Sequence, residues 1–486
     1  MKKFILLVLI TSFLGCLNTF GQNTTFEYLL ESDANLSVTD LNEDEYGNFY
    51  FTITSNEINK PNYKHTILGK ISNLGELIDT VSFRHNSKSK VFYNVHSINQ
   101  GEFILAGVEY NPDNQENISI ITYLINDNLL ISDSANYCFP EDQKFRYFNS
   151  YFEDGADLLI SGGYFTGPSF KERHSFVMIL DDELDSIGFN EFEGYLGISH
   201  FRKLNINQYW VIEEVARDIS ILDSSLNIIQ TSDVPDFIFG NYSMKWDTDT
   251  SFYLLGYNLY PSPNYNLSLL RYTSPIDTSG YQLNIIRVSD TIDFPSERNG
   301  LDYMYKDSIF AGGTRNLDKY NPYHSHQPSW LMLFQTDSLL NLRWECFYGG
   351  DAYYVMQKLI ATRDGGCLVA GTRFDYHNNN ENKTDIIVLK LNSEGLLVGQ
   401  NELQESLLRE AIVYPNPGST IMQVRLAVQH PKALLELFDS QGKLVLSQQL
   451  HEKESRINTT HLPPGTYIYR LSAATGLNES GKWIKQ

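Results

Sequence analysis

Residues 22–404 repeat one pattern about every fifty residues, and this regularity constrains the fold more than any other feature of the chain. In each repeat, a strand ends in a turn rich in Asp, Asn and Gly, and an apolar second strand follows. A third strand comes next, and a tight polar turn leads to a fourth. The expected second strands are residues 49–53, 103–107, 158–162, 209–212, 252–256, 309–313 and 367–371. The expected third strands are 67–71, 120–124, 176–180, 219–222, 267–272, 330–334 and 386–391.

Seven four-stranded units of this length predict an all-β fold, a seven-bladed β-propeller over residues 22–404. Residues 344–350 and 364–372 also resemble a propeller repeat of large secreted bacterial proteins. The fourth repeat is short, so six or eight blades stay open as alternatives. In the last repeat, the turn at 392–395 predicts a fourth strand at 396–398. Residues 25–30 precede the first full repeat and could pair with the last one to close the ring.

The connections between strands decide which residues share a face of such a ring. Because the first-to-second and third-to-fourth connections are tight turns, the second-to-third connections must emerge together on the opposite face. These connections are rich in Tyr, Asn and Pro, and aromatic rings flanked by amides suit sugars or peptides. The tyrosines expected to bind a ligand are Tyr63, Tyr110, Tyr164, Tyr260, Tyr265, Tyr323 and Tyr376. The alternative is that turn formers collect in any loop and that Tyr is merely abundant.

The negative charge of the chain is concentrated in the repeats. The formal net charge is −22, and residues 22–404 hold 26 basic against 52 acidic side chains. Such a surface repels phosphate backbones and anionic lipids, which argues against nucleic acid and membrane surfaces as partners. No segment after the N-terminal one is apolar for eighteen uninterrupted residues, so no membrane span is expected there.

A small second domain is expected at residues 412–486, joined to the repeats by a linker at 405–411. Apolar and polar residues alternate there with the period of half-buried strands, in 424–428, 434–438, 443–446 and 467–471. Gly442 stands where a hairpin turn needs positive φ, and Pro463-Pro464-Gly465 breaks the chain before the last of these strands. The pattern predicts a small immunoglobulin-like β-sandwich.

Four ordered sequence blocks make this domain more specific. They occupy residues 414–417, 437–443, 462–471 and 481–486, and they resemble the type A C-terminal sorting domain of the type IX secretion system of Bacteroidetes. The resemblance implies that the secretion machinery is a partner and that the protein reaches the cell surface or the medium. The sorting residues that it implies are Pro415, Asn416, Pro417, Gly442, Lys443, Gly465, Tyr467, Lys482 and Lys485. The alternative is an ordinary adhesive β-sandwich.

The N-terminal residues 1–21 have the features of a secretory signal peptide. Lys2 and Lys3 precede an apolar run at 4–14 that is too short to span a bilayer. Cleavage after Gly21 would leave Gln22 as the new N-terminus. Alternatively, residues 13–16 form a lipobox in which Cys16 is lipidated, although Phe fits its first position poorly.

Sequence signals for catalysis or for a metal are weak. His324, His326 and His377 lie in equivalent loops of neighbouring repeats, but no further ligand accompanies them. We therefore assign no catalytic residue, metal or cofactor. Once Cys16 is removed, three cysteines remain, which excludes a disulfide framework but leaves open one bridge between Cys346 and Cys367.

The sequence therefore favours a secreted or surface-held binding protein over an enzyme. Its ligand would be a glycan or a protein, recognised by the Tyr- and Asn-rich face of the propeller. One alternative is a secreted hydrolase that acts on polysaccharide through carboxylates in the central channel. Another is a structural component of the cell surface.

Overall fold

The computed structural model describes most of the chain between Thr25 and Lys485. The residues that it leaves undescribed are 1–24, 57–59, 61, 100, 114–117, 140–143, 153–156, 167–171, 194–196, 214–217, 234–238, 259–264, 278, 286–290, 379–382, 398–410, 415–419, 427–429, 431, 440–441, 453, 474–476 and 486. The predicted signal peptide and most of the predicted linker thus lie outside the described residues. The chain divides into two compact units, Met1–Val398 and Gly399–Gln486. The described residues of both units form strands and turns without a helix, which confirms the all-β prediction.

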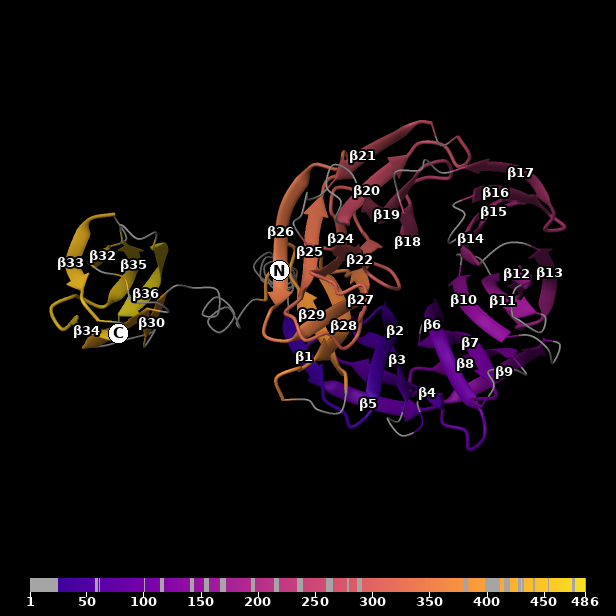
Figure 1. The fold of residues 1–486 in the computed structure, drawn as a ribbon, viewed down its shortest axis with the longest axis horizontal. Coiled ribbons are helices and arrows are strands. Elements are labelled where there is room, and N and C mark those ends of the chain that lie inside the picture. The colour runs from indigo at the N-terminus through magenta and orange to yellow at the C-terminus, as the bar shows by residue number, and fades with distance from the viewer. Residues whose placement is uncertain are drawn as a thin grey trace, which may run out of the picture. The chain divides into compact units, whose positions relative to one another are not determined.

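The first unit is a propeller-like ring of antiparallel sheets that stand around a common axis (Figure 1). One sheet has the order β10 (Lys144–Phe152), β11 (Leu158–Thr166), β12 (Glu172–Leu180) and β13 (Ser186–Glu193). The next has β14 (Ile198–Asn205), β15 (Gln208–Glu213), β16 (Asp218–Asp223) and β17 (Ile228–Asp233). A further sheet has β18 (Phe239–Trp246), β19 (Phe252–Asn258), β20 (Asn266–Tyr272) and β21 (Tyr281–Ile285). In each of them the first strand along the chain lies nearest the axis (Figure 1).

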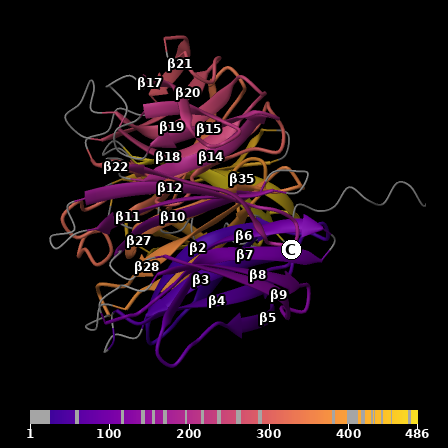
Figure 2. The ribbon, with the colours of Figure 1, turned by 90° about the vertical axis from the view of Figure 1, so that its right-hand side faces the viewer.

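An eight-stranded sheet consists of two such four-stranded parts. The first part contains β2 (Asn35–Glu43), β3 (Phe49–Asn56), β4 (Lys64–Ile71) and β5 (Leu77–Ser82). The second contains β6 (Ser89–Asn99), β7 (Glu102–Tyr110), β8 (Ser119–Asn126) and β9 (Ile131–Cys138), and both parts face the viewer in Figure 2. A single parallel pair, His65 with Lys90, joins the two parts. Each part by itself therefore repeats the four-stranded antiparallel order of the other sheets.

The ring is closed by a sheet that contains both ends of the first unit. Its order is β1 (Phe26–Leu30), β29 (Asp385–Leu391), β28 (Cys367–Phe374) and β27 (Tyr353–Ala361). Strand β1 pairs with β29 from Phe26 opposite Lys390 to Leu30 opposite Ile386. This pairing confirms the prediction that residues 25–30 join the last repeat. The predicted strand at 396–398 is wrong for its two described residues, because β1 takes the outer place and Leu397 packs into the core instead.

One sheet departs from the common pattern at its axial edge. There β22 (Asp293–Pro295) and β23 (Leu301–Asp302) both pair with β24 (Ile309–Arg315), which continues to β25 (Trp330–Thr336) and β26 (Leu342–Gly349). The innermost strand is thus broken between Pro295 and Gly300. Proline lacks the N–H that a ladder needs, and both residue types mark bulges in strands. The broken segment leaves its own sheet and pairs with β27, as described below.

The innermost strands carry a recurring irregularity. A register shift, the mark of a β-bulge, occurs between Val38 and Asp40, Phe92 and Asn94, Phe145 and Tyr147, Ile198 and His200, and Met356 and Lys358. A bulge re-aims nearby side chains, and here several of them reach the backbone of the next sheet. Such bonds join Val95 N to Asp40 Oδ2 (2.9 Å), Ser150 N to Asn94 Oδ1 (3.0 Å), Gly300 N to Ser243 Oγ (2.6 Å), Ala361 N to Asp302 Oδ2 (2.9 Å) and Val38 N to Gln357 Oε1 (2.6 Å). Neighbouring sheets are therefore tied together by polar contacts close to the axis.

Away from the axis, the sheets are held together by apolar side chains. Phe148, Ile160 and Phe176 of one sheet pack with Ile104 and Val108 of the preceding one in a single buried cluster. Trp210 packs edge to face on Trp246 of the next sheet, with ring centroids 5.2 Å apart. Burial of such surface contributes roughly 25 cal/mol per Å2 of apolar area, so these clusters supply most of the driving force for assembly of the ring.

The second unit contains two small antiparallel sheets. One has β30 (Ala411–Tyr414), β31 (Ile421–Leu426) and β34 (Glu454–Asn458). The other has β33 (Leu444–Leu450), β32 (Ala433–Phe438), β35 (Gly465–Ser472) and β36 (Asn478–Lys485). Side chains of both sheets, among them Val424, Leu435 and Trp483, share one buried cluster. Gly442 has φ of +76° in the turn before β33, as the hairpin prediction requires.

Candidate functional site

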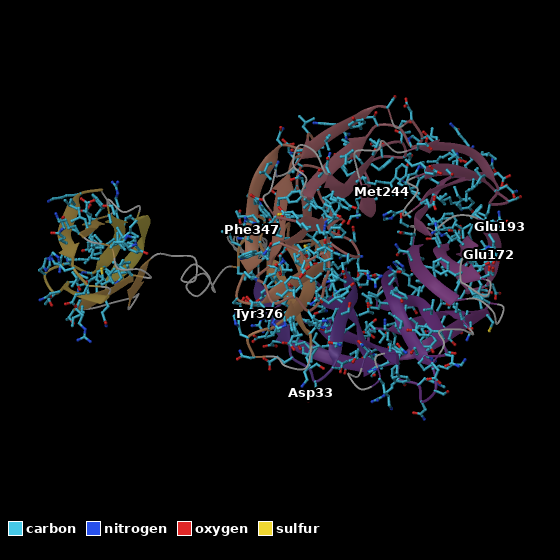
Figure 3. All side chains as sticks on the ribbon, in the orientation of Figure 1. Asp33, Glu172, Glu193, Met244, Phe347 and Tyr376 are labelled. Atoms are coloured by element: carbon cyan, nitrogen blue, oxygen red, sulfur yellow. The ribbon has the colours of Figure 1, made fainter. Side chains whose placement is uncertain are left out.

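Two connected pockets lie along the axis of the ring. The first, which we call the axial pocket, has a volume of about 350 Å3 and is lined by the innermost strands, including Asp40, His96, His200 and Lys358. Met244 of β18 also lines it, and Figure 3 shows this residue at the inner edge of the ring, whereas Glu172 and Glu193 lie farther out. Within the first unit, every sheet of the ring contributes side chains to this one space.

The second pocket, which we call the mouth pocket, has a volume of about 330 Å3. Its lining includes the start of β2, the end of β3, the start of β4 and part of the loop between β24 and β25. Thr39, Tyr93, Glu297 and Arg298 line both pockets, so the two spaces are continuous. The mouth pocket therefore opens on the side where second strands end and third strands begin.

The broken innermost strand places Glu297 and Arg298 in both pockets. Between Pro295 and Gly300 the backbone crosses to β27, where Glu297 N donates to Met356 O (3.2 Å) and Arg298 N donates to Gln357 O (2.9 Å). The Arg298 guanidinium lies over the Tyr93 ring, 5.0 Å from its centroid. A regular strand would have kept these residues in the ladder of their own sheet, so the break is what brings their side chains to the axis.

The loop between β24 and β25 is held by its own hydrogen bonds. Asp318 accepts hydrogen bonds from Tyr320 N (2.9 Å) and Ser325 Oγ (2.8 Å), and Asn321 Nδ2 donates to His324 O (2.6 Å). These contacts fix the loop that carries Tyr323. The Tyr323 hydroxyl donates to the Glu297 carboxyl, whose pKa is raised by burial even though this hydrogen bond and the neighbouring Arg298 oppose the rise.

Two ion pairs line the axial pocket. Lys358 Nζ lies 2.7 Å from Asp40 Oδ1, and Lys245 Nζ lies 2.8 Å from Asp302 Oδ1. The Asp40–Lys358 pair is nearly buried, with 4% and 14% of the side chains exposed. The Asp40 carboxylate also accepts hydrogen bonds from the backbone N–H groups of Leu41 and Val95, both at 2.9 Å. Such a pair is costly to break because one charge is left behind without a partner.

We expect Lys358→Met to lower the free energy of unfolding by about 3–5 kcal/mol, because it leaves the Asp40 carboxylate buried and unpaired. The matched control is Lys383→Met, since Lys383 lies 3.0 Å from Asp33, which is fully exposed. An exposed pair of this kind contributes at most about 1 kcal/mol. Urea unfolding of the mature chain measures both changes. Equal losses for the two variants would contradict the role of the Asp40–Lys358 pair.

Two histidines in the axial pocket are held in the neutral form. Burial lowers the pKa of His200 to about 3, with a smaller contribution from Lys358, and burial lowers the pKa of His96 to about 4. His96 Nε2 lies 2.8 Å from Ser150 Oγ. The His200 ring packs against Tyr151, with centroids 5.4 Å apart. The charged form of either ring is therefore strongly disfavoured in the folded chain.

These two histidines predict a loss of stability in weak acid. An unfolded histidine takes up its proton near pH 6.5, whereas the folded ones resist it, so the free energy of unfolding falls as the pH drops from about 6.5 to about 4. Each ring contributes roughly 3 kcal/mol of this loss at pH 4. We expect His200→Leu to flatten the profile by about this amount, and replacement of the exposed His85 by Gln to leave it unchanged. Unfolding measured at several pH values tests this, and a wild-type slope in the His200 variant would contradict it.

The structure separates the tyrosines predicted from the sequence into two groups. Tyr110 and Tyr164 are buried, with 7% and 4% of their surface exposed, and both belong to one apolar cluster. Tyr164 also stacks on His174, with centroids 5.0 Å apart. Tyr110 ends β7 and Tyr164 lies within β11, and both rings fill the space between neighbouring sheets. Neither ring presents a surface for stacking on a ligand.

The other described tyrosines lie in connections between second and third strands, each in a different sheet. Tyr323 lines the mouth pocket and is 43% exposed. Tyr63 lies just before β4, and Tyr265 just before β20, where it stacks on Tyr257 at 4.4 Å. Tyr376 follows β28 and contacts the ring of His377 at 4.2 Å. Tyr260 lies outside the described residues.

The predicted sorting residues lie in the second unit. Pro415, Asn416 and Pro417 are outside the described residues, as is the side chain of Lys482. Gly442 and Lys443 form a turn in which Lys443 N donates to Asp439 Oδ1 (2.9 Å). Gly465 begins β35. Tyr467 is buried and donates from its hydroxyl to Pro463 O (2.7 Å), and Lys485 near the end of β36 is also buried.

The structure shows what surrounds the histidines and cysteines that gave weak sequence signals for a metal site and a disulfide. The rings of His324 and His326 pack edge to face on Phe374, at 5.2 and 5.8 Å. Within the part of the chain that the structure describes, no three His, Cys, Asp or Glu side chains are grouped as a metal would need. Cys138, Cys346 and Cys367 carry free thiols. The bridge between Cys346 and Cys367 that the sequence left open is therefore not formed.

Sequence reasoning missed the charged residues of the site, namely Asp40, Lys358, Glu297 and Arg298. The ion pair joins residues that are far apart in the chain, and no local pattern indicates such a contact. A signal for Glu297 and Arg298 does exist in the sequence. Pro295 and Gly300 flank them in the sequence, at the place where the repeat requires an innermost strand. Proline and glycine within a strand indicate a bulge or a break.

Comparison with known families identifies the second unit. Residues 412–486 match the family described as secretion system C-terminal sorting domain. The chain therefore ends in a type A sorting domain of the type IX secretion system of Bacteroidetes, and the protein is exported to the cell surface or the medium. This confirms the resemblance seen in the four sequence blocks. Among the described residues, no helix is long and apolar enough to cross a membrane.

Comparisons of the whole chain give no further identification. A search of curated proteins gave no significant match. Similar solved structures include a protein of unknown function from Bacteroides caccae, with 10% identity, 65% of this chain and 94% of that chain covered, and a TM-score of 0.37. A fungal alcohol oxidase has 8% identity, coverage of 96% and 100%, and a TM-score of 0.46. PorZ, a surface component of the type IX secretion system of Porphyromonas gingivalis, has 9% identity, coverage of 96% and 86%, and a TM-score of 0.21. These scores support no argument about the site.

Proposed function

We propose that the first unit is a seven-bladed β-propeller that binds a glycan or a protein outside the cell, and that the second unit is an immunoglobulin-like sandwich. The domain bounds would be 1–21 for a cleaved signal peptide, 22–404 for the propeller, 405–411 for a linker and 412–486 for the sorting domain. The count of seven is supported by the sheet orders, in which β1 completes the sheet of β27–β29. The repeated four-stranded pattern and its closure support a rigid scaffold for binding loops.

One observation carries the proposal of binding: the mouth pocket opens on the side of the second-to-third connections. It combines a half-exposed aromatic ring, Tyr323, with the charged side chains of Lys64 and Arg298 and with polar groups such as Asn35. Ligand sites in proteins are concave and hold a few convergent polar groups of this kind. Tyr63, Tyr265, Tyr376 and Tyr260 would extend contacts to a longer ligand on the same side.

A glycan array with the purified mature chain tests the proposal. We expect retention of a defined set of glycans without turnover, and weaker retention by Tyr323→Ala, because the ring that stacks on a sugar is lost. Tyr320→Ala is the matched control, since Tyr320 lies on the same loop, is 87% exposed and does not line the mouth pocket. Equal retention by the two variants, or no retention of any glycan or surface protein, would contradict binding at this place.

A hydrolase is the second candidate, because one observation favours it. Burial raises the pKa of Glu297, while Asp40 in the same axial pocket is paired with Lys358. Glycoside hydrolases use two carboxyl groups in one site, of which the acid has a raised pKa. Release of products from the retained glycans, lost in Glu297→Gln, would replace the binding proposal by this one.

A further inference from the structure

The mouth pocket concentrates positive charge in a strongly acidic chain. Lys64 and Arg298 both line it, and Glu297 is its single carboxylate among the described residues. The chain as a whole has a net charge of −22, whereas cations outnumber carboxylates in the lining of this pocket. The other two cations that line the connected pockets, Lys245 and Lys358, are matched by Asp302 and Asp40.

Neither Lys64 nor Arg298 has an ion-pair partner within the described part of the chain. The carboxyl of Glu297 is engaged by the Tyr323 hydroxyl and by Gln357. Arg298 instead lies over the face of Tyr93. Lys64 is partly buried beside it, and burial together with the positive charge of Arg298 lowers the pKa of Lys64. Two cations that face one enclosed space repel each other, and a negative charge between them relieves that repulsion.

The same pocket holds polar atoms that suit hydroxyl groups. Asn35 Oδ1 and Thr54 Oγ1 are buried and have no hydrogen-bond partner among the described residues. Both residues line the mouth pocket, as do the rings of Tyr93 and Tyr323. Buried polar atoms without partners cost about 1–3 kcal/mol each, so they favour a ligand that offers hydrogen bonds. A simple inorganic anion would satisfy the cations but would leave the rings without a stacking partner.

We propose that the mouth pocket binds an acidic sugar whose carboxylate lies between Lys64 and Arg298. Its hydroxyl groups bond to Asn35 and Thr54, and its ring faces Tyr323. The volume of about 330 Å3 lies within the range of pockets that hold small ligands. This inference rests on the proposed binding function and names the class of ligand. Nucleic acid and acidic proteins fit less well, because their many negative charges are repelled by a chain whose net charge is −22.

Calorimetric titration with a matched pair of ligands tests the charge directly. Trigalacturonate and its fully methyl-esterified form have the same sugar framework and differ in the carboxylate charge. Charge-assisted hydrogen bonds contribute more than neutral ones, so we expect the acid to bind the mature chain about 10- to 100-fold more tightly than the ester. The affinity for the acid should fall as the salt concentration rises. Equal binding of both forms, or no binding of either, overturns the proposal.

Two variants locate the effect. Lys64→Met and Arg298→Met should each weaken binding of trigalacturonate about tenfold or more, with little effect on the ester. Lys319→Met is the control, because it removes an exposed charge from the loop of Tyr323 but does not line the pocket. Melting curves establish that the variants are folded, and the comparison of acid and ester needs no variant. If phosphate displaces trigalacturonate at equal concentration, the pocket is a site for simple anions and the proposal is overturned. If neutral glycans bind and their binding depends on Tyr323, the proposed binding function holds but the inference of an acidic sugar is wrong.

Discussion

Deletion of residues 412–486 is expected to abolish export, so that the protein accumulates in the periplasm and is absent from the cell surface and the medium. The reason is that these residues form the sorting domain that directs the chain to the type IX secretion system. Immunoblots of medium, surface and periplasmic fractions from the native host measure the result. A soluble periplasmic protein serves as the marker for leakage. Normal appearance of the truncated chain outside the cell would contradict the assignment.

The same export assay can show whether the folded domain or its sequence alone is recognised. Trp483 is fully buried and packs near Tyr467, with centroids 6.0 Å apart. Trp483→Ala should cost about 3–5 kcal/mol of domain stability and should reduce export if the folded domain is recognised. Ile468→Ala is the matched control, because Ile468 is next to Tyr467 on the exposed face of β35. Unchanged export of both variants would show that the fold is not what the machinery reads.

Removal of one aromatic ring from β1 is expected to destabilise the whole ring of sheets. Phe26 is 7% exposed, packs on Phe49 at 5.9 Å and lies over Gly75, where a Cβ would meet its ring at 2.6 Å. Gly75 also has φ of +86°, so the turn both needs a glycine and leaves room for the ring. Phe26→Ala should therefore cost about 3–5 kcal/mol, because it removes a large buried side chain from the cluster that the first and the closing sheets share.

The matched control for this prediction lies on the same strand. Leu29 is 38% exposed, so Leu29→Ala should cost well under the loss for Phe26, about 1 kcal/mol or less. Thermal unfolding of the mature chain compares the two variants with the wild type. Similar melting temperatures for both variants would mean that β1 contributes little to closure.

Much of the fold could be predicted from the sequence, because it depends on local periodicity. The second and third strands of each repeat are marked by apolar runs between turn residues, and the last pair was expected at 367–371 and 386–391. The structure places them at Cys367–Phe374 and Asp385–Leu391. In that repeat the local turn at 392–395 wrongly indicated a fourth strand at 396–398, whereas β1, which was also expected to join this repeat, takes the outer place. Local patterns do not decide between a local and a distant partner.

The site was less predictable for two physical reasons. Tyr110 and Tyr164 were expected on the surface because they adjoin loops, but strand alternation turns them towards a neighbouring sheet. The Asp40–Lys358 contact joins two innermost strands that meet only when the ring closes. Position along the chain therefore indicated which loops carry the tyrosines, whereas the charged side chains near the axis followed from tertiary structure alone.

A zero-length cross-link tests the closure of the ring most directly. Asp33 and Lys383 are separated by 350 residues, yet their side chains lie 3.0 Å apart because β1 joins β29. Carbodiimide treatment of dilute monomer, followed by digestion and mass spectrometry, should give an isopeptide between these two residues. Lys203 of β14 and Asp157, which directly precedes β11 of the preceding sheet, lie 2.9 Å apart and are the positive control. A closed ring should give both cross-links, and the control cross-link without the one between Asp33 and Lys383 would contradict closure.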